Sequence, residues 1–216
     1  MFRTAFSIAA ICTAVAAFTP RSQPHALSRG LRKNSATGGG TIMMAGNVGI
    51  YFSTMSGNTE RIAGFIGEAI GVEPKEIDEC SADAISALDV VFVGAPTWNT
   101  GADTERSGTS MDTWLYDTLP KVDMKGKTVA LFGCGDSVGY SGNFCDSLGE
   151  LHDCFTERGA TIKGSWSLED YMHYESKAVR DDKFVGLVCD EQNQMDLSEE
   201  RVTTWISQLK GEGVEL

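Results

Sequence analysis

The first 59 residues of this 216-residue sequence contain no aspartate or glutamate. The first acidic residue is Glu60, whereas five of the 18 Lys and Arg residues precede it. The rest of the chain therefore carries 13 basic residues against all 30 acidic ones, a net charge of about -17. A charge of this size repels nucleic acid and anionic lipid and favours partners with basic surfaces. We therefore exclude nucleic-acid binding as a function.

Several common site motifs are also missing after residue 46. The five cysteines in this part include no Cys-x-x-Cys pair and no metal-ligand spacing, and an odd number of them favours a reducing compartment. There is no Gly-Lys-Ser/Thr loop for a nucleoside triphosphate and no Gly-x-Gly-x-x-Gly turn for a dinucleotide. We expect no metal site and no membrane insertion of the mature protein.

The N-terminal segment has two parts that differ in composition. Arg3 precedes an apolar stretch over residues 5–18, which is too short to cross a bilayer but matches a signal-peptide core. The segment that follows is rich in Arg, Ser, Gly and Ala and lacks acids, as in a transit peptide. With Phe18 directly after Ala17, the combination resembles the bipartite plastid presequences of algae whose plastids lie inside the endomembrane system.

We therefore divide the chain into a leader and one domain. Residues 1–46 are predicted to be a bipartite plastid-targeting presequence, with the signal peptide over about 1–17, and residues 47–216 the mature domain. The predicted location is the plastid stroma (chloroplast). The alternative is a secreted protein with a disordered linker, which the odd number of cysteines disfavours.

From residue 47 onward, short apolar runs alternate with segments of helical period. This pattern is typical of a parallel sheet with helices on both faces, so we predict an α/β domain with three layers. The expected strands are 48–52, 90–94 and 128–132, with weaker ones near 76–77, 160–163 and 184–188, and the expected helices include 62–70, 144–155 and one from about 198.

Three polar loops follow the three strong strands. Residues 53–59 offer hydroxyls, a glycine and a helix N-terminus, which suit a phosphate monoester. Residues 95–101 place Trp98 in a polar loop, where it could stack on a flat heterocycle. Residues 133–143 combine glycines with an acid and a tyrosine, so backbone amides can approach a ring closely.

Each loop also has a simpler explanation. The first could be an ordinary helix cap, the second could hold a tryptophan folded onto the core, and the third could be a flexible turn. However, the carboxyl ends of parallel strands meet at one edge of the sheet, where such folds bind ligands. The three loops together therefore favour a binding site over three unrelated turns.

The joint motif set resembles that of flavodoxins. The matching stretches are 54–59, 96–101 and 135–140, and the resemblance extends from Val48 to about Leu209. Residues 177–187 are similar to a stretch near the end of long-chain flavodoxins, as found in algal plastids. The resemblance implies a flavodoxin-like sandwich with a five-stranded parallel sheet of order 2-1-3-4-5, whose last strand is interrupted by an insertion.

The resemblance also implies non-covalent FMN. Residues 54–59 would bind its phosphate, and Trp98 and Tyr140 would lie on the two faces of the isoalloxazine ring. Asp136 and neighbouring amides would hold the pyrimidine edge, and the Asn99–Thr100 peptide would meet flavin N5. Because Thr100 is not glycine, the turned form of this peptide should be harder to reach than in relatives with glycine there. The predicted cofactor-binding residues are Thr54, Met55, Ser56, Gly57, Asn58, Thr59, Pro96, Thr97, Trp98, Asn99, Thr100, Gly101, Cys134, Gly135, Asp136, Tyr140 and Asn143.

The implied function is one-electron transfer at low potential rather than enzyme catalysis. A plastid address implies photosystem I as donor and ferredoxin–NADP reductase as acceptor, with the protein replacing ferredoxin when iron is scarce, and a monomer is expected. The main alternative is an FMN-dependent NAD(P)H quinone reductase, which needs an open flavin face. A flavin domain of a larger reductase and a regulatory module without flavin are further alternatives.

Four features depart from the common pattern or extend it. Asn58 stands where many flavodoxins have lysine, and Cys134 where threonine is common. Residues 102–113 form a longer segment, interpreted as a tolerated surface insertion rather than a docking element. Residues 163–184 resemble the insertion of long-chain members, and His173 within it is expected to be a solvated or hydrogen-bonding loop residue.

Overall fold

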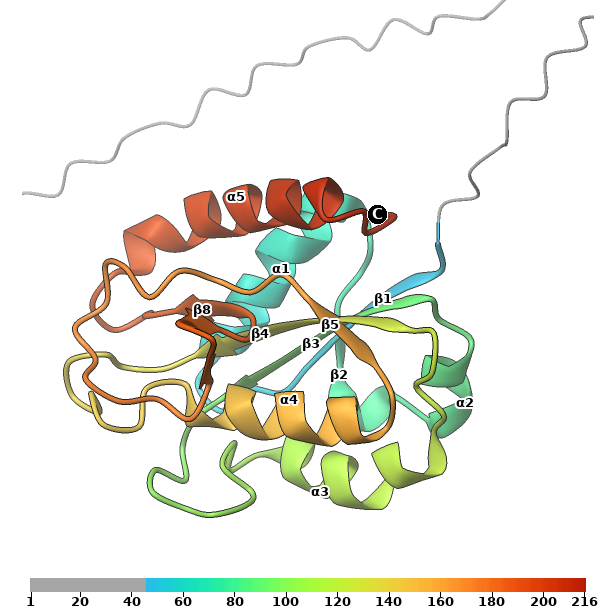
Figure 1. The fold of residues 1–216 in the computed structure, drawn as a ribbon, viewed down its shortest axis with the longest axis horizontal. Coiled ribbons are helices and arrows are strands. Elements are labelled where there is room, and N and C mark those ends of the chain that lie inside the picture. The colour runs from blue at the N-terminus through green and yellow to red at the C-terminus, as the bar shows by residue number, and fades with distance from the viewer. Residues whose placement is uncertain (1–45) are drawn as a thin grey trace, which may run out of the picture. The chain divides into compact units, whose positions relative to one another are not determined.

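The computed structural model describes residues 46–216, so the predicted presequence lies outside the described residues except for Gly46. The larger sheet is parallel throughout, and its strands follow the order β2-β1-β3-β4-β5, as predicted from the sequence (Figure 1). An additional strand, β8, also pairs with β4. The strands of this sheet are β1 (Val48–Phe52), β2 (Lys75–Glu76), β3 (Val90–Pro96), β4 (Thr128–Cys134), β5 (Thr161–Lys163) and β8 (Leu187–Cys189).

Helices cover both faces of this sheet, which gives the three predicted layers. Figure 1 shows α1 and α5 on one face and α3 and α4 on the other. Every residue of β3 is buried, as is all of β4 after its first residue, because each face packs against apolar helix side chains. The helices are α1 (Asn58–Ile70), α2 (Ala82–Ser86), α3 (Ser110–Asp117), α4 (Asp146–Glu157) and α5 (Ser198–Gly211).

The last strand is divided into two halves, which confirms the predicted interruption. β5 pairs with residues 128–130 of β4, and β8 pairs with residues 132–134 of the same strand. Between the halves lies the insertion, residues 164–186, which contains the antiparallel pair β6 (Val179–Arg180) and β7 (Lys183–Phe184). The expected single piece at 184–188 is therefore split between β7 and β8.

Gly186 explains where this split falls. A Cβ atom at this position would lie 2.1 Å from the carbonyl oxygen of Leu131, so only glycine allows the chain to pass so close to β4. The weak strand expected at 76–77 is also displaced, because β2 ends at Glu76 and Ile77 begins a 3₁₀ turn, Ile77–Glu79, that packs into the core.

The insertion is anchored by an aromatic cluster. The His173 ring centroid lies 5.0 Å from that of Phe184 and 5.4 Å from that of Phe144, and the Tyr171 hydroxyl donates to the Val188 carbonyl at 2.7 Å. His173 is therefore half-buried rather than fully solvated, and the prediction that it forms hydrogen bonds is wrong for Nδ1. The ring packs among aromatics, and its Nδ1 has no hydrogen-bond partner among residues 46–216.

None of the helices in residues 46–216 is long and apolar enough to cross a membrane. In the same part of the chain, no three His, Cys, Asp or Glu side chains form a group that could hold a metal ion. The five cysteines in residues 46–216 are all free thiols.

The packing of His173 makes stability depend on pH. Burial lowers the pKa of His173 below its usual value, so the unfolded chain binds a proton more readily than the folded one. The stabilisation is present above about pH 6.5 and is lost as the pH falls through the unfolded value. We expect His173→Phe to lose less stability than the wild type between pH 7.5 and 5.5, as measured by urea unfolding. Equal losses would contradict this account of His173.

Candidate functional site

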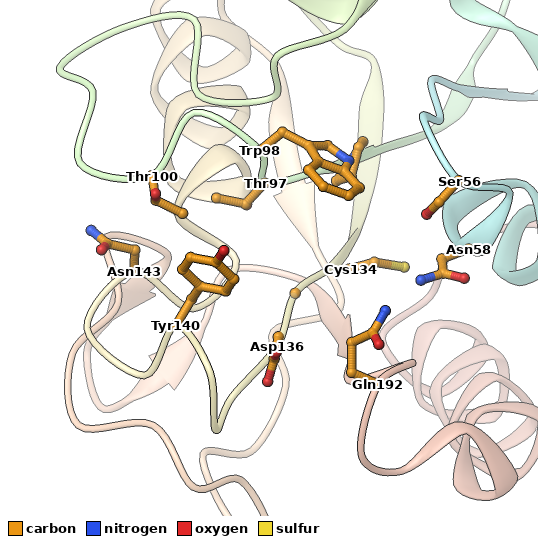
Figure 2. Close-up of a pocket in the computed structure, with 12 residues that line it drawn as sticks. Ser56, Asn58, Thr97, Trp98, Thr100, Cys134, Asp136, Tyr140, Asn143 and Gln192 are labelled. Carbon is orange, nitrogen blue, oxygen red and sulfur yellow. The ribbon is translucent and has the colours of Figure 1, made fainter.

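The loops that follow β1, β3 and β4 surround one cavity at the carboxyl edge of the sheet, as the sequence predicted. A fourth loop, after β8, joins them. The cavity has a volume of about 280 Å³, and Figure 2 shows its lining side chains. The lining residues are Ser56, Asn58, Pro96, Thr97, Trp98, Thr100, Cys134, Gly135, Asp136, Tyr140, Asn143 and Gln192.

Eleven of these twelve residues belong to the predicted set. The predicted residues that do not line the cavity are Thr54, Met55, Gly57, Thr59, Asn99 and Gly101. These six lie in the same loops or at the start of α1. Their individual roles stay predictions.

The loop before α1 has the geometry of an anion site. Gly57 adopts a left-handed conformation, with φ of 85°, and its N–H donates to Thr54 Oγ1 at 2.9 Å. Asn58 begins the helix, so the unpaired N–H groups of the first turn are available beside the cavity. The Thr59 hydroxyl is buried and has no hydrogen-bond partner among the described residues. These groups fit a phosphate.

Two large aromatic side chains border the cavity. Trp98 comes from the loop after β3 and is 51% exposed, and Tyr140 comes from the loop after β4 and is 58% exposed. Figure 2 shows the two rings on different sides of the space. Large apolar side chains that stay this exposed on neighbouring loops are typical of surfaces that bind a flat ring. Trp98 is therefore not folded onto the core.

The Trp98 loop is held from behind by residues 102–113. A Cβ atom on Gly108 would lie 2.9 Å from Trp98 Cβ, and the Thr109 hydroxyl donates to Ser53 Oγ at 2.6 Å. The Asp112 carboxylate accepts from the backbone N–H of Gly108 at 2.7 Å. The interpretation of this segment as a tolerated surface insertion is thus wrong, because part of it is buried framework for the site.

The Asp136 carboxylate accepts hydrogen bonds from the backbone of its own loop. Its Oδ1 accepts from the N–H groups of Gly139 at 2.7 Å and Val138 at 3.1 Å, and from Asn193 Nδ2 at 2.9 Å. The Gly139 N–H is the main reason why the pKa of Asp136 lies below its usual value, and the bonds from Asn193 and Val138 act in the same direction. Asp136 therefore carries a negative charge beside the cavity at neutral pH.

A second acidic residue joins the loops after β4 and β8. Asp190 is fully buried and accepts from the N–H of Ser137 at 3.0 Å and from that of Asn193 at 3.0 Å. The same loop brings Gln192 to the cavity. Sequence reasoning missed both residues, although a polar run directly after an apolar piece near 184–188 was a usable signal.

The Cys134 thiol lines the cavity but is expected to be unreactive. Burial raises its pKa well above 9.0, so the thiol stays protonated and is a weak nucleophile. The side chain is 4% exposed and packs with Phe132 and Cys189 in the core on the α1 and α5 side. We infer that Cys134 supplies packing rather than covalent chemistry.

Comparison with known proteins assigns the chain to a family. The model of the Flavodoxin family matches residues 50–205. Flavodoxin of Picosynechococcus sp. is 44% identical over 170 residues, which cover 76% of this chain and 95% of the relative. Flavodoxin 1 of Escherichia coli is 40% identical over 170 residues, which cover 76% of this chain and 93% of the relative. The chain therefore belongs to the flavodoxin family.

A solved structure agrees with this assignment. Fusobacterium nucleatum flavodoxin, determined bound to flavin mononucleotide, aligns with a TM-score of 0.70 at 26% identity. The alignment covers 77% of this chain and 98% of the Fusobacterium protein. The chain thus shares its fold with a solved flavodoxin, and the resemblance to flavodoxins inferred from the motifs is confirmed.

Proposed function

We propose that this chain binds FMN without a covalent bond and carries one electron at a time. The observation that carries the proposal is the pair of half-exposed aromatics, Trp98 and Tyr140, beside a hydroxyl loop with the unpartnered Thr59 hydroxyl. Membership of the flavodoxin family and the FMN-bound Fusobacterium structure support FMN as the cofactor.

The described residues fit each part of FMN. Residues 54–59 would hold the phosphate with hydroxyls and helix N–H groups, without a positive side chain in the loop. Trp98 and Tyr140 would enclose the ring, and Asp136 with the amides of its loop would hold the polar ring edge. The Asn99 carbonyl accepts the Ala102 N–H at 3.2 Å, so a turn of the Asn99–Thr100 peptide toward the ring would break this bond.

The flavin supplies the redox chemistry when it is bound, and the protein supplies the surroundings. With FMN bound, the two aromatic rings would exclude water from the flavin ring, and Asp136 would place a negative charge near it. Both effects oppose the addition of negative charge to the site, which favours a low reduction potential. Enclosure of both flavin faces also favours electron transfer over hydride transfer from a nicotinamide.

The finer part of the proposal concerns location and partners. We propose that the protein works in the plastid stroma as a monomer and accepts electrons from photosystem I. It would pass them to ferredoxin–NADP reductase in place of ferredoxin under iron limitation. The acid-free, two-part leader over residues 1–46 supports the location, and the net charge of the mature domain, about -17, supports docking to basic partner surfaces.

We expect the purified mature domain to be yellow and to be reduced in two resolved one-electron steps. The second step should lie at a strongly negative potential, because it adds negative charge to an acidic, partly dry site. Anaerobic potentiometric titration followed by visible absorbance measures both steps. The reduced protein should then transfer electrons to ferredoxin–NADP reductase, at a rate that falls with rising salt.

Other results would select the alternatives. A single two-electron step with rapid NAD(P)H oxidation would indicate a quinone reductase, and a purified protein that binds no flavin would indicate a regulatory module. If the titration behaves as expected but ferredoxin–NADP reductase accepts no electrons, the carrier function stands and the partner proposal is wrong.

Thr59→Val should weaken FMN binding about tenfold or more, because a hydrogen bond to a charged group contributes roughly 1.5–3 kcal/mol. Riboflavin, which lacks the phosphate, should bind both proteins equally. Quenching of flavin fluorescence on titration with the FMN-free protein measures both affinities. Thr204→Val, an exposed site on α5, is the matched control and should change neither. An equal loss for riboflavin would place Thr59 outside the phosphate site.

Residues 1–46 fused to a fluorescent protein should direct the fusion into the plastid of an alga with endomembrane-enclosed plastids. A fusion that lacks residues 1–17 should remain in the cytosol, because entry into the endomembrane system requires the signal peptide. Fluorescence microscopy decides the outcome. Secretion of the complete fusion would overturn the plastid proposal and leave FMN binding unaffected.

A further inference from the structure

A buried carboxylate lies behind the Trp98 loop, outside the cavity lining. Glu150 belongs to α4 and is only 5% exposed. One of its oxygens, Oε1, accepts the Glu105 N–H at 2.7 Å, and the other, Oε2, accepts the Arg106 N–H at 2.8 Å. The Tyr116 hydroxyl on α3 also donates to Oε1. A carboxylate is acceptor-only, so it satisfies all three donors at once.

Residues 105 and 106, whose N–H groups bond to Glu150, also bond to Asn99 through their carbonyls. The Glu105 carbonyl accepts from Asn99 Nδ2 at 2.7 Å, and the Arg106 carbonyl accepts the Asn99 N–H at 3.2 Å. The Glu105 carbonyl and the Arg106 N–H belong to the same peptide group. Glu150 and Asn99 therefore bond to opposite sides of one peptide, and consecutive hydrogen bonds of this kind strengthen one another.

The turn that presents these groups is not one that the chain favours by itself. Glu105 has a φ of 57°, a left-handed conformation that costs free energy for any residue with a Cβ. Its backbone therefore needs partners that compensate for this cost. The Glu150 carboxylate supplies the charged acceptor on the buried side.

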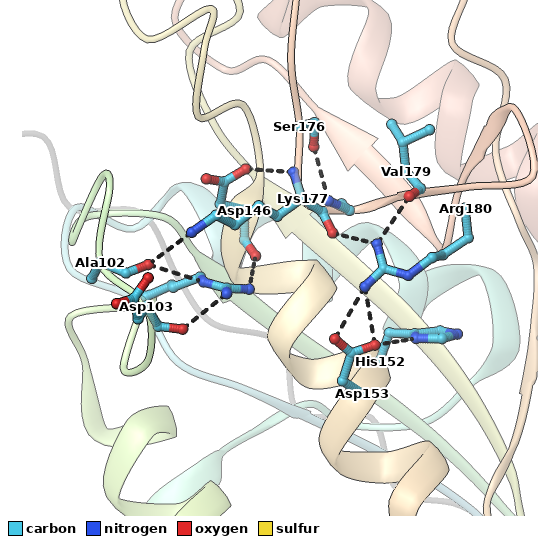
Figure 3. A network of polar contacts seen from close by, with 11 residues as sticks. Ala102, Asp103, Asp146, His152, Asp153, Ser176, Lys177, Val179 and Arg180 are labelled. Atoms are coloured by element: carbon cyan, nitrogen blue, oxygen red, sulfur yellow. Dashed lines mark hydrogen bonds and ion pairs between the residues drawn. The ribbon is translucent and has the colours of Figure 1, made fainter.

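The outer part of the same loop has separate attachments. The Arg106 guanidinium donates to the carbonyls of Ala102 at 3.2 Å and Asp103 at 2.9 Å. Lys177, from the insertion, donates through Nζ to the Ala102 carbonyl at 3.2 Å and through its N–H to Asp146 Oδ1 at 2.7 Å (Figure 3). These contacts hold residues 102–103. From the side of α4, Glu150 accepts both N–H groups of the segment that bonds to Asn99, and the Asp146 carbonyl accepts a longer bond, at 3.5 Å, from the Arg106 guanidinium.

We propose that Glu150 is a positioning residue for the cofactor site. It does not line the cavity, but it fixes residues 105–106 and, through them, Asn99, whose neighbours Trp98 and Thr100 do line it. The inference rests on the proposed binding of FMN and adds a residue that sets the affinity from a distance. Loss of the carboxylate would leave the Trp98 loop free to adopt conformations that do not receive the flavin ring.

We call the two hydrogen bonds from the Glu105 and Arg106 N–H groups to Glu150 the clamp. Amide hydrogen exchange of the FMN-free protein, resolved by residue, tests the clamp without any cofactor. In the wild type, the Glu105 and Arg106 amides should exchange much more slowly than those of Asp103 and Thr104, which are exposed and donate to no described residue. Glu150→Gln turns one acceptor into a donor. It should speed exchange at residues 105, 106 and 99 at least tenfold and leave the α1 amides unchanged.

The matched control is Glu157→Gln, which removes one charge from an exposed position on the same helix. It should leave exchange in the loop unchanged. Faster exchange throughout α1 would show that Glu150→Gln weakens the whole domain, which would overturn the local role. If Glu150→Gln fails to fold, the wild-type pattern decides the question, and rapid exchange at residues 105 and 106 would overturn the clamp.

Flavin affinity tests the consequence for the site. Glu150→Gln should weaken FMN and riboflavin by the same factor, about tenfold, because the clamp acts on the ring loop and not on the phosphate loop. Unchanged affinity in a variant with fast exchange would show that the clamp does not position the site. If the wild type binds neither flavin, the proposed function fails, whereas the exchange experiment still reports on the clamp.

Discussion

The site depends on one constraint, the parallel register of strands that are buried on both faces. Pro96 pairs with Cys134, and Cys134 with Cys189, so the last residues of β3, β4 and β8 lie in one row. The loops that follow these strands must start side by side, together with the loop after β1. Residues separated by more than a hundred positions in the sequence, such as Ser56 and Gln192, thereby line the same cavity.

Around the cavity, carboxylates hold the backbone of the binding loops. Asp112 accepts N–H groups at residues 107 and 108, Glu150 at 105 and 106, and Asp136 at 138 and 139. Asp190 does the same for residue 137 and for the loop after β8. Some of the negatively charged side chains therefore have a structural role. Their carboxylates hold the backbone of loops that have few buried apolar side chains.

Local signals account for what could be predicted from the sequence. The three strong strands are continuous apolar runs, and the polar loops follow them directly, so the cavity and most of its lining were accessible, whereas the strand order came from the resemblance to flavodoxins. Glu150 was not accessible, because its partners lie about 45 positions away and an acid within a helix has no distinctive local pattern. Asp190 lies in a polar run that signals a further loop, but its partner Ser137 is 53 positions away, so the run does not reveal its role. His173 was misjudged because its aromatic neighbours come partly from another segment.

The divided last strand has a consequence for how this fold can change in length. Lys163 pairs with Ala130 and Leu187 with Phe132, so the whole insertion occupies the space opposite one residue, Leu131. A single residue in place of 164–186 would join β5 and β8 into one continuous strand with the same neighbours. Chains with and without such an insertion can therefore share one sheet, but loss of this insertion would also remove its bonds to the cavity loops, such as that from the Met172 N–H to Ser137 Oγ.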